Sequence, residues 1–147
     1  MTDPATELLR TLTGNSPPKT APRADNQPLA RGQVKAALPA LGKDAEIVQV
    51  RRIVVPPGGT TGWHYHPGPL LTVVNQGVLT YTLARDLSTE TVEAGQSFVE
   101  AAGSDHAHIG SNLGNEDLIM YTVYFLPSAS SPLAFRVPAP GTDASAG

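Results

Sequence analysis

The stretch that decides the fold is residues 58–77, Gly-Gly-Thr-Thr-Gly-Trp-His-Tyr-His-Pro-Gly-Pro-Leu-Leu-Thr-Val-Val-Asn-Gln-Gly. Within it, His64 and His66 are separated by a single residue. On a β-strand, two such residues point to the same face, about 6–7 Å apart along the strand. Two imidazoles at that separation can converge on one metal ion with bonds of about 2.1 Å. The stretch therefore predicts a strand that carries two metal ligands.

A second pair of histidines with the same spacing, His106 and His108, follows later in the chain. The protein has four histidines in all, so each of them belongs to a His-x-His pair. One such pair on a strand is more often surface decoration or a satisfied polar contact than a metal site. Two pairs with no further histidine favour a metal site whose third nitrogen ligand comes from the second pair.

Composition removes several classes of function. The 147 residues suffice for one domain with a core, and the net charge of -3, with scattered lysines and arginines, argues against nucleic-acid binding. The absence of cysteine excludes disulfides, thiolate metal ligands and cysteine nucleophiles. No apolar run approaches the length of about 18–20 residues that a membrane helix needs. Without a signal-peptide pattern at the N-terminus, we expect a cytoplasmic protein.

The two ends of the chain differ from its middle. Residues 2–13 predict a short helix, capped by Asp3, and residues 14–30 hold four prolines and few apolar residues, which is typical of an arm. This arm is either a disordered leader or a strap across a partner subunit. The C-terminal segment is rich in Pro, Gly, Ala and Ser and predicts disorder. We therefore expect a helix and arm over 1–31, a β-barrel domain over 32–137 and a disordered tail over 138–147.

Between these ends, short β-rich runs alternate with turn residues. Such runs at regular spacing, with no helical period, argue for an all-β sandwich or barrel. The predicted strands cover residues 46–55, 78–83, 89–92, 97–100, 106–109 and 118–125.

The residues around the first histidine pair resemble the first motif of the cupin superfamily, Gly-x5-His-x-His-x3-Glu-x6-Gly. Gly58, His64, His66 and Gly77 stand at its positions, with Leu70 in place of the glutamate. The resemblance to this superfamily, and to small single-domain members of the cupin_2 type, covers about residues 44–126. It implies an all-β jelly-roll barrel, also called a double-stranded β-helix, with a metal ion inside it.

The second cupin motif, Gly-x5-Pro-x-Gly-x2-His-x3-Asn, is matched less closely. Gly95 and Gly103 fit, but two extra residues follow Gly103. His106 therefore fits the Gly-x2-His spacing, whereas His108 fits the His-x3-Asn spacing that ends at Asn112. We favour His108 as the third ligand because its spacing lies within one unbroken strand and turn. His106 would share its face and is expected to be a fourth ligand or a pocket residue.

The leucine at the glutamate position changes the expected chemistry. Three neutral imidazoles leave a divalent ion its full +2 charge, which favours an anionic oxygen ligand at the open positions. Octahedral iron would keep three positions free, whereas tetrahedral zinc would keep one for water. Iron, manganese, nickel and zinc all accept imidazole, so the spacing predicts one divalent transition metal ion without naming it.

Two hypotheses of function follow. Three-histidine cupins that resemble this chain include dioxygenases of diketones, which implies an oxygenase acting on a small oxygen-bearing organic substrate in the barrel. The alternative is a non-catalytic cupin that binds or senses a metal or small molecule. Candidate catalytic residues are Glu100, as a base or as an acceptor for an imidazole N–H, and Tyr81 in the pocket. Glu100 could instead be a solvated strand end, and Tyr81 a core residue.

Assembly is the last expectation. Single-domain cupins are often dimers, and open β-sandwiches have edge strands that must be covered or paired. Residues 31–38 alternate apolar and polar positions, which suits an added edge strand. We therefore expect a homodimer in which the segment before residue 44 contributes to the contact.

Overall fold

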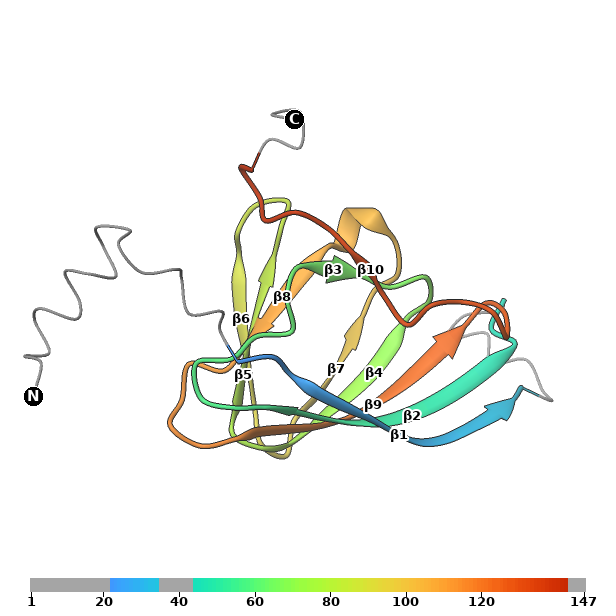
Figure 1. The fold of residues 1–147 in the computed structure, drawn as a ribbon, viewed down its shortest axis with the longest axis horizontal. Coiled ribbons are helices and arrows are strands. Elements are labelled where there is room, and N and C mark those ends of the chain that lie inside the picture. The colour runs from blue at the N-terminus through green and yellow to red at the C-terminus, as the bar shows by residue number, and fades with distance from the viewer. Residues whose placement is uncertain (1–21, 35–43, 143–147) are drawn as a thin grey trace, which may run out of the picture.

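The computed structural model describes residues 22–34 and 44–142 of the chain. Within these residues the protein is all-β, as predicted, and folds into two antiparallel sheets that face each other (Figure 1). The helix predicted over residues 2–13 lies outside the described residues. No helix in the described part of the chain is long and apolar enough to cross a membrane.

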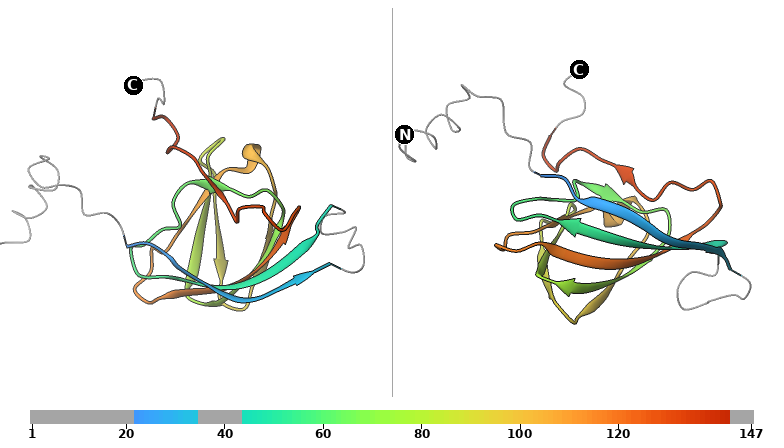
Figure 2. Two further views of the ribbon diagram at one scale, coloured as in Figure 1. Left: turned by 45° about the vertical axis from the view of Figure 1, so that its right-hand side comes forward. Right: turned by 60° about the horizontal axis from the view of Figure 1, so that its bottom comes forward.

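Each sheet contains five strands. The strand order is β1-β2-β9-β4-β7 in the first sheet and β10-β3-β8-β5-β6 in the second. Figure 2 shows the sheets curving around a common interior. The first sheet comprises β1 (Asp25–Gln33), β2 (Ile47–Val55), β4 (Leu70–Gln76), β7 (Ser97–Glu100) and β9 (Leu118–Leu126). The second comprises β3 (His64–Tyr65), β5 (Val78–Leu83), β6 (Thr89–Glu93), β8 (His108–Ser111) and β10 (Phe135–Arg136).

The core follows from strand alternation. Along β9, Leu118, Met120, Thr122 and Tyr124 are buried, while the residues between them are more exposed. Because side chains alternate between the faces of a sheet, this strand turns one buried, mainly apolar stripe towards the opposite sheet. One end of the interior is packed with apolar side chains, namely Ile53, Val55, Val74, Leu79, Val92, Leu118 and Met120.

The first strand begins earlier than the sequence indicated. β1 pairs with β2 from Asp25 onwards, whereas the barrel domain was expected to start at residue 32. Pro28 lies within it, and the register shifts between Pro28 and Ala30. Proline is tolerated there because β1 is an edge strand, on which a missing N–H costs no ladder bond. Residues 25–30 of the predicted proline-rich arm therefore form part of the edge strand of the first sheet.

The C-terminal segment also differs from expectation. Residues 138–142 of the predicted disordered tail are placed on the structure, and the Thr142 N–H donates to the Ala139 carbonyl over 3.1 Å. Residues 143–147 lie outside the described residues.

A tight turn leads from the first histidine pair into β4. A Cβ atom at Gly68 would overlap the carbonyl oxygen of Phe125, so the chain can pass β9 this closely only with glycine. The Phe125 N–H in turn donates to the Pro69 carbonyl over 3.1 Å. This turn fixes where His66 leaves β3 and where Leu70 enters β4.

Candidate metal centre

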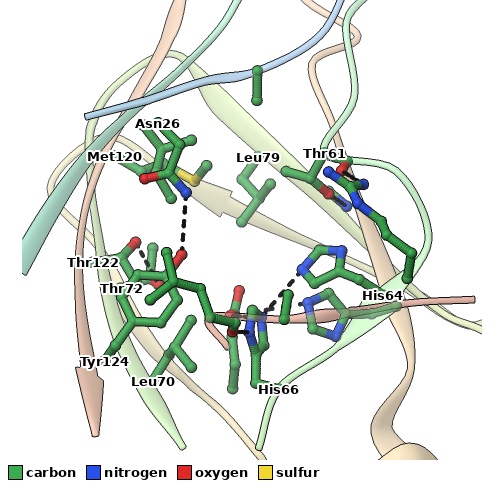
Figure 3. Close-up of a pocket in the computed structure, with 18 residues that line it drawn as sticks. Asn26, Thr61, His64, His66, Leu70, Thr72, Leu79, Met120, Thr122 and Tyr124 are labelled. Carbon is green, nitrogen blue, oxygen red and sulfur yellow. Dashed lines mark hydrogen bonds and ion pairs between the residues drawn. The ribbon is translucent and has the colours of Figure 1, made fainter. Parts of the chain in front are cut away.

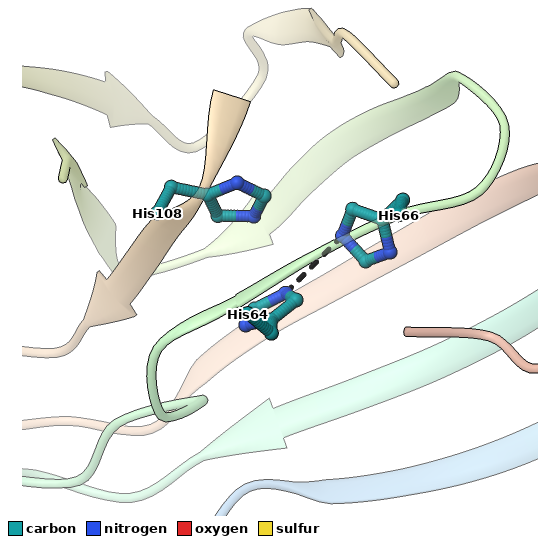
Figure 4. Close-up of side chains that lie close together, drawn as sticks. All are labelled: His64, His66 and His108. Carbon is teal, nitrogen blue, oxygen red and sulfur yellow. Dashed lines mark hydrogen bonds between the residues drawn. The ribbon is translucent and has the colours of Figure 1, made fainter. Parts of the chain in front are cut away.

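Three histidines, two of them in strands and one just after a strand, meet at one end of the interior. His64 on β3 lies directly opposite His108 on β8 in the antiparallel register. His66 follows β3 by one residue and turns its ring towards the same space (Figure 4). The ring centroid of His64 lies 4.7 Å from that of His66 and 4.4 Å from that of His108.

The distances suit a single ion. The Nε2 atoms of His64 and His66 are 3.1 Å apart, and ring nitrogens of all three histidines lie within 4.8 Å of one another. Two ligand atoms bonded to one ion at about 2.1 Å, at tetrahedral or right angles, are about 3.0–3.4 Å apart. The three side chains are buried, with exposed fractions of 8%, 2% and 1% for His64, His66 and His108.

Backbone carbonyls set the orientation of every ring. Nδ1 of His64 donates to the Gly62 carbonyl over 2.7 Å, and Nδ1 of His66 donates to Leu133 over 2.8 Å. Nδ1 of His108 donates to the carbonyl of His106 over 2.9 Å. A carbonyl can only accept, so each Nδ1 carries the proton and each neutral ring presents the lone pair of Nε2. This second contact is what metal-binding histidines commonly have.

The resulting group contains acceptors that face one another. The lone pairs of His64 and His66 would repel at 3.1 Å without a positive charge between them. Nε2 of His108 is fully buried and has no hydrogen-bond partner among the described residues. Buried polar atoms are rarely left without a partner, so the group has the donor set of a cation site.

Burial keeps the imidazoles of His64 and His108 neutral. It lowers the pKa of His64 to about 4, helped by the nearby His108 and His66. Burial also lowers the pKa of His108, although the charge of Glu100 acts in the opposite direction. Metal ions bind the neutral form of imidazole, so these two rings are ready to bind at neutral pH.

A carboxylate completes the cluster. Glu100, at the end of β7, places Oε2 at 3.2 Å from His66 Nε2 and 3.9 Å from His108 Nε2. Burial alone would raise the pKa of Glu100, but the adjacent imidazoles, that of His66 first, outweigh burial and lower the pKa overall. Of the two alternatives for Glu100, a solvated strand end does not describe this side chain, which is 11% exposed.

His106 does not join the other three histidines. The sequence placed it on a strand with His108, but Ser104–His106 form a short 3-10 helix that precedes β8. The helix starts after Gly103, whose φ of 102° favours glycine. Strand alternation therefore does not apply to His106, and its half-buried side chain lies outside both the histidine cluster and the pocket wall.

The ring of Tyr81 packs behind the cluster. It stacks on His108 with a centroid distance of 4.6 Å and meets Phe98 edge-on at 5.4 Å. Burial, the charge of Glu100 and that of Glu90 raise its pKa. Tyr81 is absent from the pocket wall, in keeping with the core alternative.

The cluster opens into a pocket between the sheets. Figure 3 shows His64 and His66 on one side of it, with Thr72, Thr122 and Tyr124 across from them. Its volume is about 120 Å³, enough for a small organic molecule. Apolar side chains of Ile53, Leu70, Leu79, Met120 and Leu133 form much of the wall.

The sequence model of the cupin domain family matches residues 51–124, which is half of the chain. The chain belongs to the cupin family. The structure locates the two positions at which the sequence departs from the cupin motifs. His108 rather than His106 accompanies the first-motif pair, and Leu70 lines the pocket where the motif has glutamate. Asn112, the last residue of the second motif, donates to the carbonyls of Val55 and Glu116 and so anchors the end of β8.

Several solved structures are similar to this one. A cupin-like protein from Thermotoga maritima superposes with a TM-score of 0.54 at 23% identity, over 63% of this chain and 65% of that one. An oxalate oxidase gives a TM-score of 0.53 at 26% identity, over 61% of this chain and 46% of that one. A recombinant oxalate oxidase in complex with glycolate gives 0.52 at 25% identity, over 60% of this chain and 45% of that one. This cupin thus spans less than two thirds of these relatives. No curated protein matches it.

Three residues of the pocket wall are not indicated by any motif in the sequence. Near the N-terminal end of the described chain, Ala24 just before β1 and Asn26 on β1 line the pocket. Near the C-terminal end, Arg136 on β10 lines it as well. The amide of Asn26 donates to the Tyr124 hydroxyl over 3.4 Å, and the guanidinium of Arg136 donates to the Thr61 carbonyl. Ala24 and Asn26 lie in the proline-rich arm and Arg136 lies near the end of the predicted barrel domain, and neither stretch carries a motif that would mark a pocket.

Proposed function

We propose that this cupin is a metal-dependent enzyme, an oxygenase acting on a small oxygen-bearing organic substrate. One observation carries the proposal. Three buried imidazoles, each with Nδ1 bound to a backbone carbonyl, converge on one side of a pocket of about 120 Å³. His64, His66 and His108 would hold the ion, and their carbonyl-bound Nδ1 atoms keep the rings in place.

The bound ion would supply Lewis acidity and open positions for substrate and dioxygen. The chain's own residues bind and orient the substrate. Among the described residues, Arg136 is the only lysine or arginine in the pocket wall, and its guanidinium suits a carboxylate or an enolate oxygen. The apolar wall around Leu79 and Met120 excludes water from the rest of a small molecule.

Two similar structures support a small oxygen-rich substrate. Both are oxalate oxidases, at 26% and 25% identity, and one of them is in complex with glycolate. Oxalate and glycolate are small carboxylic acids that fit beside one guanidinium. We therefore extend the expected substrates from diketones to small hydroxy acids and dicarboxylic acids.

Oxygen consumption tests the proposal. Protein loaded with iron(II), and separately with manganese(II), is assayed with oxalate, glycolate, diketones and catechols. The expected result is uptake with at least one compound, abolished in the His64→Ala/His66→Ala variant. Labelled dioxygen then separates an oxygenase, which incorporates oxygen into product, from an oxidase that releases hydrogen peroxide. Metal binding without turnover of any compound would favour the non-catalytic alternative.

We also propose a homodimer that uses β1. This strand is the edge of the first sheet, and every one of its residues is exposed. Leu29, at the register shift, is 52% exposed. Light scattering of the intact chain and of Leu29→Lys is the test, since a charge there opposes edge pairing. Two monomeric proteins would exclude this contact.

A further inference from the structure

The position of the missing glutamate has a direct neighbour. Leu70, which occupies it on β4, pairs with Glu100 on β7 in the antiparallel register. Residues directly opposite each other on antiparallel strands share a face, with Cβ atoms about 4.5–5.5 Å apart. Both residues line the pocket. Glu100 therefore brings a carboxylate to the same face of the same sheet, one strand away from the motif position.

The carboxylate approaches the histidines from the metal side. Its Oε2 lies 3.2 Å from Nε2 of His66 and 3.9 Å from Nε2 of His108. An acceptor that merely orients a ring binds Nδ1–H, on the far side from the ion. In all three rings that position is already taken by a backbone carbonyl. This geometry removes the outer acceptor role that the sequence allowed for Glu100.

The charges point the same way. Among the described residues, the only basic side chains within 4.0 Å of the Glu100 carboxylate are His66 and His108. Both Nε2 atoms present lone pairs when the rings are neutral, so carboxylate and imidazoles are mutually repelling acceptors. A cation between the carboxylate and the two imidazoles would replace these repulsions with coordination bonds. Without such a cation, burying the carboxylate costs free energy of folding.

We propose that Glu100 is the fourth protein ligand of the metal centre, a carboxylate moved from β4 to β7. The inference rests on the metal site of the proposed function, but not on the reaction. It changes the expected charge, since one carboxylate lowers the net charge of a divalent site from +2 to +1. Compared with a three-histidine site, the centre would have one fewer open position.

Metal affinity and the spectrum of bound cobalt(II) test the ligand role without any turnover. Glu100→Gln and Glu100→Ala are titrated with manganese(II) by calorimetry, and Glu93→Gln on β6 serves as the exposed carboxylate control. We expect Glu100→Gln to weaken binding by more than about 100-fold, beyond what loss of an outer contact costs. The visible cobalt(II) bands should change in this variant and stay unchanged in Glu93→Gln.

Returning the carboxylate provides the decisive comparison. Leu70→Glu in the Glu100→Ala background restores the motif position, and formate can enter the space left in Glu100→Ala. At least one of them should recover manganese(II) affinity, and formate should have no effect on the unaltered protein. A Glu100→Gln variant that binds metal as tightly, with the same cobalt(II) spectrum, would overturn the ligand role alone. A loss that neither change reverses would also overturn it. Failure of the unaltered protein to bind metal would instead overturn the metal site itself.

Discussion

The two His-x-His pairs have the same spacing in the sequence and different positions in the structure. His64 and His66 both turn into the cluster, because the chain stays extended through β3 and the residue after it. In the second pair only His108 does so, because the 3-10 helix Ser104–His106 redirects the chain just before β8. A residue spacing of two thus specifies a common face only where the backbone is extended.

The largest expected effect separates residues inside the cluster from the one outside it. The double variant His64→Ala/His66→Ala removes two of three imidazoles and should abolish measurable metal binding. His106→Ala is the matched control from the second pair and should bind as the unaltered protein does. Metal analysis of untagged protein and calorimetry are the measurements. Full metal content in the double variant would contradict the assignment of the site.

Acid should destabilise the metal-free protein through the buried rings. His64 has a pKa of about 4 in the folded state against 6.5 as its ordinary value, so the unfolded state takes up a proton first. Stability is then lost as the pH falls from 6.5 towards 4, by up to about 3 kcal/mol. The lowered pKa values of His108 and Glu100 act with the same sign.

Urea unfolding at about pH 7.5 and at about pH 4.5 measures the effect. These two conditions lie on either side of most of the His64 titration. His64→Gln removes the group and should make stability less dependent on pH. An equally steep dependence in that variant would show that other groups cause the acid effect.

A smaller loss of stability is expected from a change just after β8, the strand that carries His108. Asn112 is buried, and its amide donates to the carbonyls of Val55 and Glu116 over 2.8 and 2.7 Å. Asn112→Ala leaves the buried carbonyl of Val55 without this donor, which costs about 2 kcal/mol of unfolding free energy. The exposed Asn75, in the segment after the first pair, provides the control Asn75→Ala. Equal denaturation midpoints for both variants would rule out an anchoring role.

The smallest effect concerns the ring behind His108. Tyr81→Phe keeps the stack at 4.6 Å and removes only the hydroxyl group. Metal affinity and the unfolding midpoint should stay unchanged, since the ring rather than the hydroxyl supports the imidazole. Once a substrate is known, a fall in turnover at unchanged metal affinity would assign the hydroxyl a catalytic role.

Patterns local in sequence predicted much of this molecule. The strands over 78–83 and 97–100 have the predicted bounds, because alternation and turn residues act over a few neighbouring residues. The convergence of His64 and His66 follows from the same rule. His108 was favoured through a motif spacing, and its position opposite His64 agrees with that choice.

What the sequence could not provide depends on register between distant strands. The pairing of Leu70 with Glu100 joins β4 to β7, and no local pattern states which residues become neighbours across strands. The positive φ at Gly103, where the chain enters the 3-10 helix, likewise depends on how this turn packs. The early start of β1 was hidden because proline is rare in strands, except at the edges.

The carbonyl that holds His66 imposes an order of events during synthesis. Leu133, which accepts the proton of His66 Nδ1, lies 67 residues further along the chain. A nascent chain that has emerged from the ribosome only as far as β9 already contains all the clustered histidines but lacks this acceptor. The ring of His66 is free to rotate at that stage. The arrangement of the three imidazoles seen in the structure is therefore complete only after the segment before β10 has been synthesised.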